Sequence, residues 1–425
     1  MIEIKPLPQN HFHCPECHSE QPEILDVQLH SVYTMAECKC NRCGLDFYQT
    51  LPIGHCINDS VSVRKSDGRI YTDVNPEFWL ADVVTKARRN SRDKEVPVRK
   101  IVHEHKRDVV VLNTLDYLYG HVLLKLYNYQ HHIRNNPNIG LVVIVPRAFE
   151  WLAPAEASEV WVVDLSLGEL ACEHPSLTKY FESEFRRFDR IWLSNAYSHP
   201  DFTQVDMKSM TGIAPFNLDS YTTEPPTITF VLREDRWWLR SKLEYLLYRF
   251  GRRFPAVRKF CYEMINIEQD ELVKRTIKAI RKKLPDARFF VTGLGENKGF
   301  GRYAMDSRST QVSEEKELEW IRIYAHSHVV IGFHGSNMLM PTAFAAGCIE
   351  VLPEDRYGNF LQDISVRYND RRQSFFYRFA DQYSSPRSIA AKAISMIKDY
   401  QGFVDNMCRN QYHDNAMTDI IDQRK

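Results

Sequence analysis

Four cysteines near the amino terminus have the spacing of a metal-ligand set. Cys14 and Cys17 form one Cys-x-x-Cys pair, and Cys40 and Cys43 form a second. Two residues between thiolates allow both sulfurs of a pair to bind one ion, and two such pairs complete a tetrahedral Zn²⁺ site. Four thiolates leave no open position, so we expect a structural ion and not a catalytic one. Reduced buried thiols, or a redox pair, are the alternative.

The surrounding segment has the features of a small zinc ribbon. A strand-like stretch, "EILDVQLHSVYTMAEC", separates the two pairs, and Gly44 suits a tight turn after the second. Cys38 is expected to be a spare thiol, and His13, His18 and His55 are substitute ligands that four cysteines do not require. Such a ribbon serves either as a folding and docking module or as a nucleic-acid-binding module, and we favour the first.

A second candidate site follows an apolar run near the carboxyl terminus. The run, "VVIGF", stops at His334-Gly335-Ser336-Asn337. Ligands of doubly wound sheets bind beyond the carboxyl ends of strands, and a glycine lets the backbone approach a ligand closely. We therefore expect residues 335–340 to hold an anion such as a diphosphate, before a helix that begins near Pro341. For His334, the alternative to a ligand role is a core histidine with internal partners.

Two further residues near this loop have candidate ligand roles. Glu350 lies inside the next apolar stretch, "CIEVLP", where a carboxylate needs donors, and ribose hydroxyls could supply them. An internal partner such as Arg356 is the alternative. Gly293 opens the loop "GLGENKGFGR" after another strand, and the sequence leaves open whether this loop is a ligand wall or a flexible turn.

These residues require a framework of alternating strands and helices. From Asp108 onward, short apolar runs alternate with amphipathic segments, and the pattern restarts after Pro225-Pro226. This alternation predicts an α/β fold with two Rossmann-type units. The expected divisions are a zinc ribbon at 1–58, a connecting region at 59–104, Rossmann-type domains at 105–222 and 227–385, and a helical segment at 386–425.

The composition limits the classes of partner. The chain has 425 residues, with 55 Lys and Arg against 55 Asp and Glu, and this balance argues against a protein that coats polyanions. A local basic stretch remains at residues 249–259. The start lacks the features of a signal peptide, and no apolar run reaches the length of a membrane span. We therefore expect a cytoplasmic protein.

Three segments resemble glycosyltransferase family 61. The stretch from Ser313 to Pro353, "SEEKELEWIRIYAHSHVVIGFHGSNMLMPTAFAAGCIEVLP", resembles the family's carboxyl-terminal signature. "FVLREDRWWL", with Arg233 at the end of a strand, resembles the first strand of the same domain. "YLYGHVLLKLYN", with Gly120 and His121, resembles its amino-domain motif. The resemblance implies a GT-B fold: two facing Rossmann-type domains, of which the second holds a nucleotide-sugar and the first an acceptor.

The resemblance also implies direct, inverting transfer of a sugar to a hydroxyl group of a saccharide or other acceptor. No Asp-x-Asp motif occurs in the chain, in agreement with transfer that needs no catalytic metal. Such transfer requires a base for the acceptor hydroxyl and groups that stabilise the departing diphosphate. We expect His121, or else Asp116, to be the base, and Arg233 to contact the diphosphate. His121 packing at the start of its helix, and Arg233 at the solvated surface, are the alternatives.

Two other functions are weighed against this one. In the first, the zinc ribbon and the basic stretch bind nucleic acid or protein, and the GT-B-like body is only a scaffold. In the second, a GT-B enzyme transfers a group other than a sugar. Affinity for nucleotide-sugars separates these functions, because only a nucleotide-sugar enzyme gains stability from that ligand.

Overall fold

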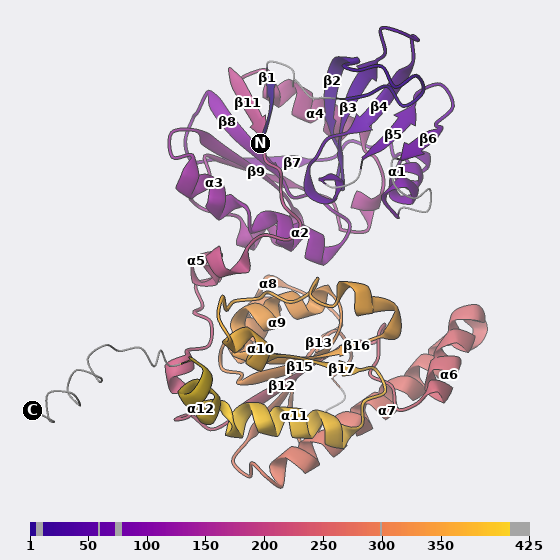
Figure 1. Ribbon diagram of the computed structural model, residues 1–425. Helices are drawn as coiled ribbons and strands as arrows, with labels where there is room; N and C mark the ends of the chain where they lie inside the picture. The colour runs from indigo at the N-terminus through magenta and orange to yellow at the C-terminus, as the bar shows by residue number, and fades with distance from the viewer. Residues whose placement is uncertain (6–11, 58–59, 73–78, 298–299, 409–425) are drawn as a thin grey trace, which may run out of the picture. The chain divides into compact units, whose positions relative to one another are not determined.

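The computed structural model describes the chain except residues 6–11, 58–59, 73–78, 298–299 and 409–425. Its contacts divide the chain into two compact units, Met1–Asp201 and Phe202–Lys425. Both contain a sheet with parallel strands and flanking helices, so the predicted α/β class with Rossmann-type units is confirmed (Figure 1). The division of contacts falls ahead of Pro225-Pro226, where the sequence pattern restarts.

The first unit is built on a six-stranded sheet of order β1-β11-β8-β9-β10-β7. Its parallel centre consists of β8 (Asp108–Asn113), β9 (Gly140–Pro146), β10 (Glu159–Val163) and β11 (Arg190–Leu193). Strands β1 (Ile2–Lys5) and β7 (Val98–Val102) pair antiparallel at the two edges. The helices that follow the central strands are α2 (Tyr119–Leu126), α3 (Tyr129–Asn135) and α4 (Pro175–Phe185). The central strands are nearly continuous apolar runs because both faces of a parallel sheet are covered.

A second sheet in this unit is antiparallel and lies next to the cysteine pairs in sequence. Its strands, in order, are β2 (Glu23–Leu29), β3 (Thr34–Lys39), β4 (Asp46–Thr50), β5 (Val61–Arg64) and β6 (Ile70–Thr72). Helix α1 (Trp79–Arg89) contributes Leu80 and Val84 to a core with Met35 and Val61. The segment 59–104, expected as a connection, thus supplies two strands and a helix here, and β7 to the larger sheet.

The second unit contains a six-stranded sheet in which every strand is parallel. Its order is β14-β13-β12-β15-β16-β17, which in chain order is the doubly wound 3-2-1-4-5-6 arrangement. The strands are β12 (Thr227–Leu232), β13 (Arg288–Gly293), β14 (Met305–Asp306), β15 (Val329–Phe333), β16 (Gly347–Leu352) and β17 (Tyr377–Asp381). Chain order reverses between β12 and β15, and ligands of such sheets bind at that point.

Helices of the second unit differ in length from those expected. They are α5 (Met207–Thr211), α6 (Lys242–Arg253), α7 (Pro255–Arg281), α8 (Glu314–Ala325), α9 (Leu339–Phe344), α10 (Arg372–Phe376), α11 (Pro386–Lys398) and α12 (Tyr400–Phe403). Helix α7 begins well before the amphipathic stretch that predicted it. The pattern missed its first half because several apolar side chains there face outward. No helix among the described residues combines the length and apolar character that a bilayer crossing needs.

Candidate functional site

The loops that follow β12 and β15 meet at the reversal of strand order in the second unit. Strand β12 ends at Leu232 and leads into Arg233, while β15 ends at Phe333 and leads into His334. The two strands are hydrogen-bonded neighbours, so their loops leave the same edge of the sheet side by side. The sequence predicted both loops as ligand contacts, and the topology brings them together.

Gly335 supports two guanidinium groups. Its φ of +148° is one that side-chain-bearing residues rarely adopt. A β-carbon there would lie 2.8 Å from Arg233 Nη1 and 3.2 Å from Arg236 Nη1. Arg233 Nη1 donates to Asn337 Oδ1 at 3.0 Å, and Arg236 Nη1 donates to the carbonyl of His334 at 3.2 Å. The glycine therefore keeps the turn clear for both arginines.

The two arginines differ in how their charge is compensated. Arg233 forms a bidentate pair with Asp235 through Nε at 2.6 Å and Nη2 at 2.5 Å. Arg236 forms no ion pair with any residue that the structure describes. Burial lowers the pKa of Arg236, and the neighbouring charges of Arg233 and Arg356 lower it further. A half-buried cation without an ion-pair partner is costly, so this guanidinium favours an anion beside it.

Asn337 and Ser336 complete the turn. Asn337 Nδ2 is buried and has no hydrogen-bond partner in the described part of the chain, so a donor is left over beside the two arginines. Ser336 begins a short 3-10 turn, Ser336–Met338, and α9 then begins at Leu339. The expected start near Pro341 is therefore two residues late. Proline is tolerated there because the first-turn N–H groups of a helix have no internal partner.

A cavity of about 470 Å³ adjoins Arg236. Phe333, Pro353 and Gln382 line it at the carboxyl ends of β15, β16 and β17. Its other walls carry four aromatic side chains, one leucine, three arginines and three carboxylates: Trp237, Tyr245, Tyr248, Tyr383, Leu239, Arg236, Arg252, Arg356, Asp235, Glu354 and Asp355. The volume lies within the usual range of small-molecule sites. The aromatic walls suit a flat ring, and the arginines and carboxylates make the lining mixed in charge.

His334 and Glu350 have internal partners instead of exposed ligand positions. His334 is 1% exposed, with Nδ1 3.1 Å from Glu350 Oε1 and Nε2 3.3 Å from Asp363 Oδ2. Glu350 is fully buried, so its expected contact with ribose is wrong for this conformation, and its partner is His334, not Arg356. The turn after β15 thus presents its backbone at the candidate site, while the ring of His334 is buried in the core.

The protonation of the hydrogen-bonded side chains Glu350, His334 and Asp363 follows from their surroundings. Burial, and then the charge of Asp363, raise the pKa of Glu350 well above its usual range. Burial lowers the pKa of His334, which favours the neutral ring. A protonated Glu350 donates to Nδ1, and Nε2–H donates to Asp363. The one orphan, Glu350 Oε2, is then a carbonyl oxygen, which is less costly to leave unpaired than a carboxylate oxygen.

We expect the variant Glu350→Gln to gain stability relative to the wild type as pH rises. The unfolded chain loses the Glu350 proton above about pH 4.5, whereas the folded chain retains it. The stability contributed by this carboxyl is therefore full below that pH and is lost as pH rises toward the folded pKa. Between pH 5 and pH 8 the free energy of unfolding of Glu350→Gln should gain up to about 1.4 kcal/mol per pH unit on that of the wild type.

Urea unfolding at pH 5, 6.5 and 8 measures this difference. Exposed Glu354, four residues along the chain, provides the control, since Glu354→Gln should follow the wild-type profile. Parallel profiles for Glu350→Gln and the wild type would show that Glu350 is ionised in the folded protein.

Gly293 has a packing role at the end of β13. Its φ is +103°, and a β-carbon would lie 2.2 Å from the carbonyl oxygen of Leu232. The residue is thus required by the close approach of β12, and we leave it out of the candidate site. Residues 298–299 of its loop lie outside the described residues.

The first unit carries a histidine–carboxylate pair at its own reversal of strand order. Strand β8 lies between β9 and β11, and Asp116 and His121 follow it. His121 Nδ1 donates to Asp116 Oδ2 at 3.2 Å, and Lys125 Nζ donates to the same oxygen at 3.0 Å. Burial would raise the pKa of Asp116, but the charge of Lys125 and the hydrogen bond from His121 lower it well below its usual range. Asp116 is fully buried and stays ionised, so it orients His121 and is not itself an accessible base.

His55 is a member of this cluster that the sequence did not reveal. Its ring centroid lies 4.0 Å from that of His121, far from any role as a substitute ligand beside the cysteines. Burial, and then the charges of His121 and Lys125, lower the pKa of His55 to about 3, so the ring is neutral at pH 7. His55, Asp116 and His121 offer three ligand atoms within 4.8 Å of one another. Lys125 already neutralises the charge of Asp116, so this cluster does not need a metal ion to balance its carboxylate.

The four cysteines form a compact thiol cluster. Cys14 Sγ lies 3.6 Å from Cys43 Sγ, and Cys17 Sγ lies 3.6 Å from Cys40 Sγ. A tetrahedral ion about 2.3 Å from each sulfur spaces the sulfurs about 3.8 Å apart, so the set could hold a structural metal ion. Cys38 Sγ instead faces the carbonyl of Ala36 at 3.8 Å.

The turns around these cysteines explain how the pairs are held. The N–H of His18 donates to the carbonyl of Cys14, and the N–H of Gly44 donates to that of Cys40, both at 2.9 Å. His18 and Gly44 occupy equivalent positions with φ of +55° and +73°. Equivalent turns therefore present the two thiol pairs.

Comparison with known proteins gives only distant resemblances. No family model matches the sequence, and no curated protein matches it. The solved structure of E. coli ADP-heptose LPS heptosyltransferase II aligns with 70% of this chain and 100% of its own, at 10% identity and a TM-score of 0.38. E. coli heptosyltransferase WaaC with ADP aligns with 70% of this chain and 97% of its own, at 12% identity and a TM-score of 0.33. A GtfA/B complex aligns with 93% of this chain and 67% of its own, at 11% identity and a TM-score of 0.22. Resemblances at this level assign neither a reaction nor a site residue.

Proposed function

We propose that the protein is an inverting glycosyltransferase that moves a sugar from a nucleotide-sugar to a hydroxyl acceptor without a catalytic metal. The observation that supports this most directly is the unpaired guanidinium of Arg236 beside Gly335, at the reversal of strand order. The diphosphate binds Arg236 and Arg233, with the spare donor of Asn337 beside them. The aromatic walls of the adjoining cavity hold the nucleobase.

In this proposal, His121 is the general base. Its Nδ1–H is held by Asp116, which leaves Nε2 to take the proton of the acceptor hydroxyl. The hydroxyl oxygen attacks the anomeric carbon as the bond from that carbon to the diphosphate breaks. The leaving electron pair remains on the diphosphate, where Arg236 and Arg233 stabilise the added negative charge. Asp116 stabilises the imidazolium that forms.

The direct test is product analysis with nucleotide-sugars and a panel of hydroxyl acceptors. Release of the nucleoside diphosphate, together with an acceptor product whose anomeric configuration is inverted in its NMR spectrum, supports the proposal. Retention of configuration, or dependence of turnover on an added divalent metal, contradicts it.

We further propose that Cys14, Cys17, Cys40 and Cys43 bind one structural Zn²⁺. The thiol spacing supports this assignment, and four thiolates leave no position for substrate. Such an ion joins the two turns and stabilises the end of the antiparallel sheet.

We expect elemental analysis of the purified chain to give one zinc ion per molecule. Cys40→Ser should reduce the zinc content to near zero, because three remaining thiolates bind far more weakly. Cys38→Ala is the matched control, since its thiol lies two residues away and outside the cluster, and it should retain the ion. Loss of zinc from Cys38→Ala, or a metal-free wild type, would exclude this ligand set.

A further inference from the structure

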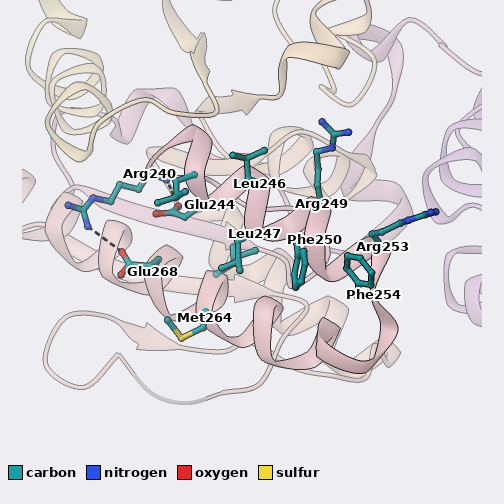
Figure 2. Close-up of a pocket in the computed structure, with 12 residues that line it drawn as sticks. Arg240, Glu244, Leu246, Leu247, Arg249, Phe250, Arg253, Phe254, Met264 and Glu268 are labelled. Carbon is teal, nitrogen blue, oxygen red and sulfur yellow. Dashed lines mark hydrogen bonds and ion pairs between the residues drawn. The ribbon is translucent and has the colours of Figure 1, made fainter.

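Helix α6 and the first half of α7 expose an apolar groove of about 980 Å³ (Figure 2). Leu243, Leu246, Leu247 and Phe250 follow one another at helical spacing along α6. Leu243 is 74% exposed, Leu246 is 56% exposed and Phe250 is 50% exposed. Monomeric proteins rarely expose so continuous an apolar surface, and such surfaces mark a contact with a partner or a membrane.

The groove continues from α6 onto α7. Phe250 and Phe254 pack together with ring centroids 4.7 Å apart, and Met264 of α7 lies across from them (Figure 2). Further along α7, Phe260 and Ile267 are also exposed. The apolar area therefore belongs to a helical hairpin, and a single exposed side chain does not account for it.

A cluster of cations borders the groove. Residues 249–259 contain Arg249, Arg252, Arg253, Arg258 and Lys259 and no carboxylate. None of these five forms an ion pair with another described residue. Two carboxylates, Glu244 and Glu268, also line the groove, and Glu268 pairs with Arg240. Figure 2 shows Arg249 and Arg253 extending from the same end of α6 as Phe250, close to Phe254. The charges of Arg249 and Arg253 are thus available to a partner that also covers the apolar side chains.

We propose that this hairpin docks the protein on an anionic lipid bilayer. An amphipathic helix with arginines beside leucine and phenylalanine inserts its apolar face at the headgroup boundary, while the cations bind anionic headgroups. Nucleic acid satisfies the cations but leaves Leu243 and Leu246 exposed. An anionic bilayer satisfies both.

The test is sedimentation of the full chain with vesicles of phosphatidylcholine alone or with 30% phosphatidylglycerol. We expect the protein to bind only the anionic vesicles, and we expect added salt to weaken this binding because it screens the arginine charges. The variant Arg249→Gln/Arg253→Gln should bind about 25-fold more weakly, at roughly fivefold per arginine. Leu243→Ser/Leu246→Ser should weaken binding at least about 10-fold, since each exposed side chain loses its burial in the bilayer. Arg387→Gln, an exposed arginine of α11, is the control and should bind like the wild type.

Three results would overturn the proposal. The first is equal binding to both vesicle types, or none to either. The second is a dimer that Leu243→Ser/Leu246→Ser dissociates, which assigns the groove to a second copy. The third is oligonucleotide binding that Arg249→Gln/Arg253→Gln abolishes and Leu243→Ser/Leu246→Ser leaves intact. Circular dichroism spectra that match the wild type establish that each variant is folded; the substituted leucines and arginines are solvent-accessible, so folding is expected to persist.

Discussion

Replacing His121 with alanine is expected to reduce turnover of the nucleotide-sugar by about 10²- to 10⁴-fold, the usual contribution of a general base. The reason is geometric: Asp116 fixes Nδ1–H, so the opposite nitrogen is the one available to accept a proton. Because the proposed donor contacts lie in the other unit, the KM for the nucleotide-sugar should change little. Steady-state kinetics with the donor concentration varied at saturating acceptor measures both kcat and this KM, with hydrolysis by water as a second readout.

His105→Ala is the matched control for this substitution. His105 is an exposed histidine of the same unit, outside the Asp116 cluster, and its loss should leave kcat unchanged. If His121→Ala retains wild-type kcat, the histidine only packs at the start of α2, and the base lies elsewhere.

Replacing Arg236 with alanine is expected to reduce kcat/KM for the nucleotide-sugar by about 10²- to 10³-fold, the cost of losing one preorganised donor to a developing charge. The half-buried guanidinium forms no ion pair with a described carboxylate, although the charges of Asp235 and Asp363 act on it, so its charge is available to the diphosphate. Arg233 is already paired with Asp235, and Arg233→Ala should therefore cost less.

Two comparisons make the Arg236 result specific. Arg236→Lys keeps a positive charge but loses the planar fork, so it should recover only part of the affinity. Arg387→Ala removes an exposed arginine outside the cavity and should leave kcat/KM unchanged. Equal kinetics for Arg236→Ala and the wild type would remove this side chain from the donor site.

The sheets were predictable from sequence because their strands are buried on both faces. Strands β8, β9, β12 and β15 are short apolar runs between amphipathic segments, which is the pattern that a covered parallel sheet produces. Strands β5 and β6 escaped notice because runs of four and three residues are too short to show alternation. The long start of α7 escaped because its apolar residues face outward, against the usual pattern.

The candidate site was predictable only in part. Motif position located the turn at Gly335 and the cysteine cluster, since glycine and thiol spacing have local consequences. The state of Arg236 is not local: its lack of a carboxylate partner depends on where β12, β15 and β16 place Asp235, Asp363 and Arg356. His55 lies 66 residues before His121, and only the fold brings the two rings together. Glu350 and His334 were read as ligand contacts because sequence does not distinguish a buried polar pair from a site.

The central claim is that the turn at Gly335 and the guanidinium of Arg236 bind a nucleoside diphosphate group. Thermal-shift measurements against UDP-, GDP-, ADP-, TDP- and CMP-linked sugars test it most directly, since a ligand at 100 times its Kd stabilises the folded state by about 2.7 kcal/mol. We predict that at least one diphosphate-linked sugar raises the Tm of the wild type, and that Arg236→Ala abolishes the shift. A wild type that none of these ligands stabilises, or a shift of equal size in Arg236→Ala, would contradict the account.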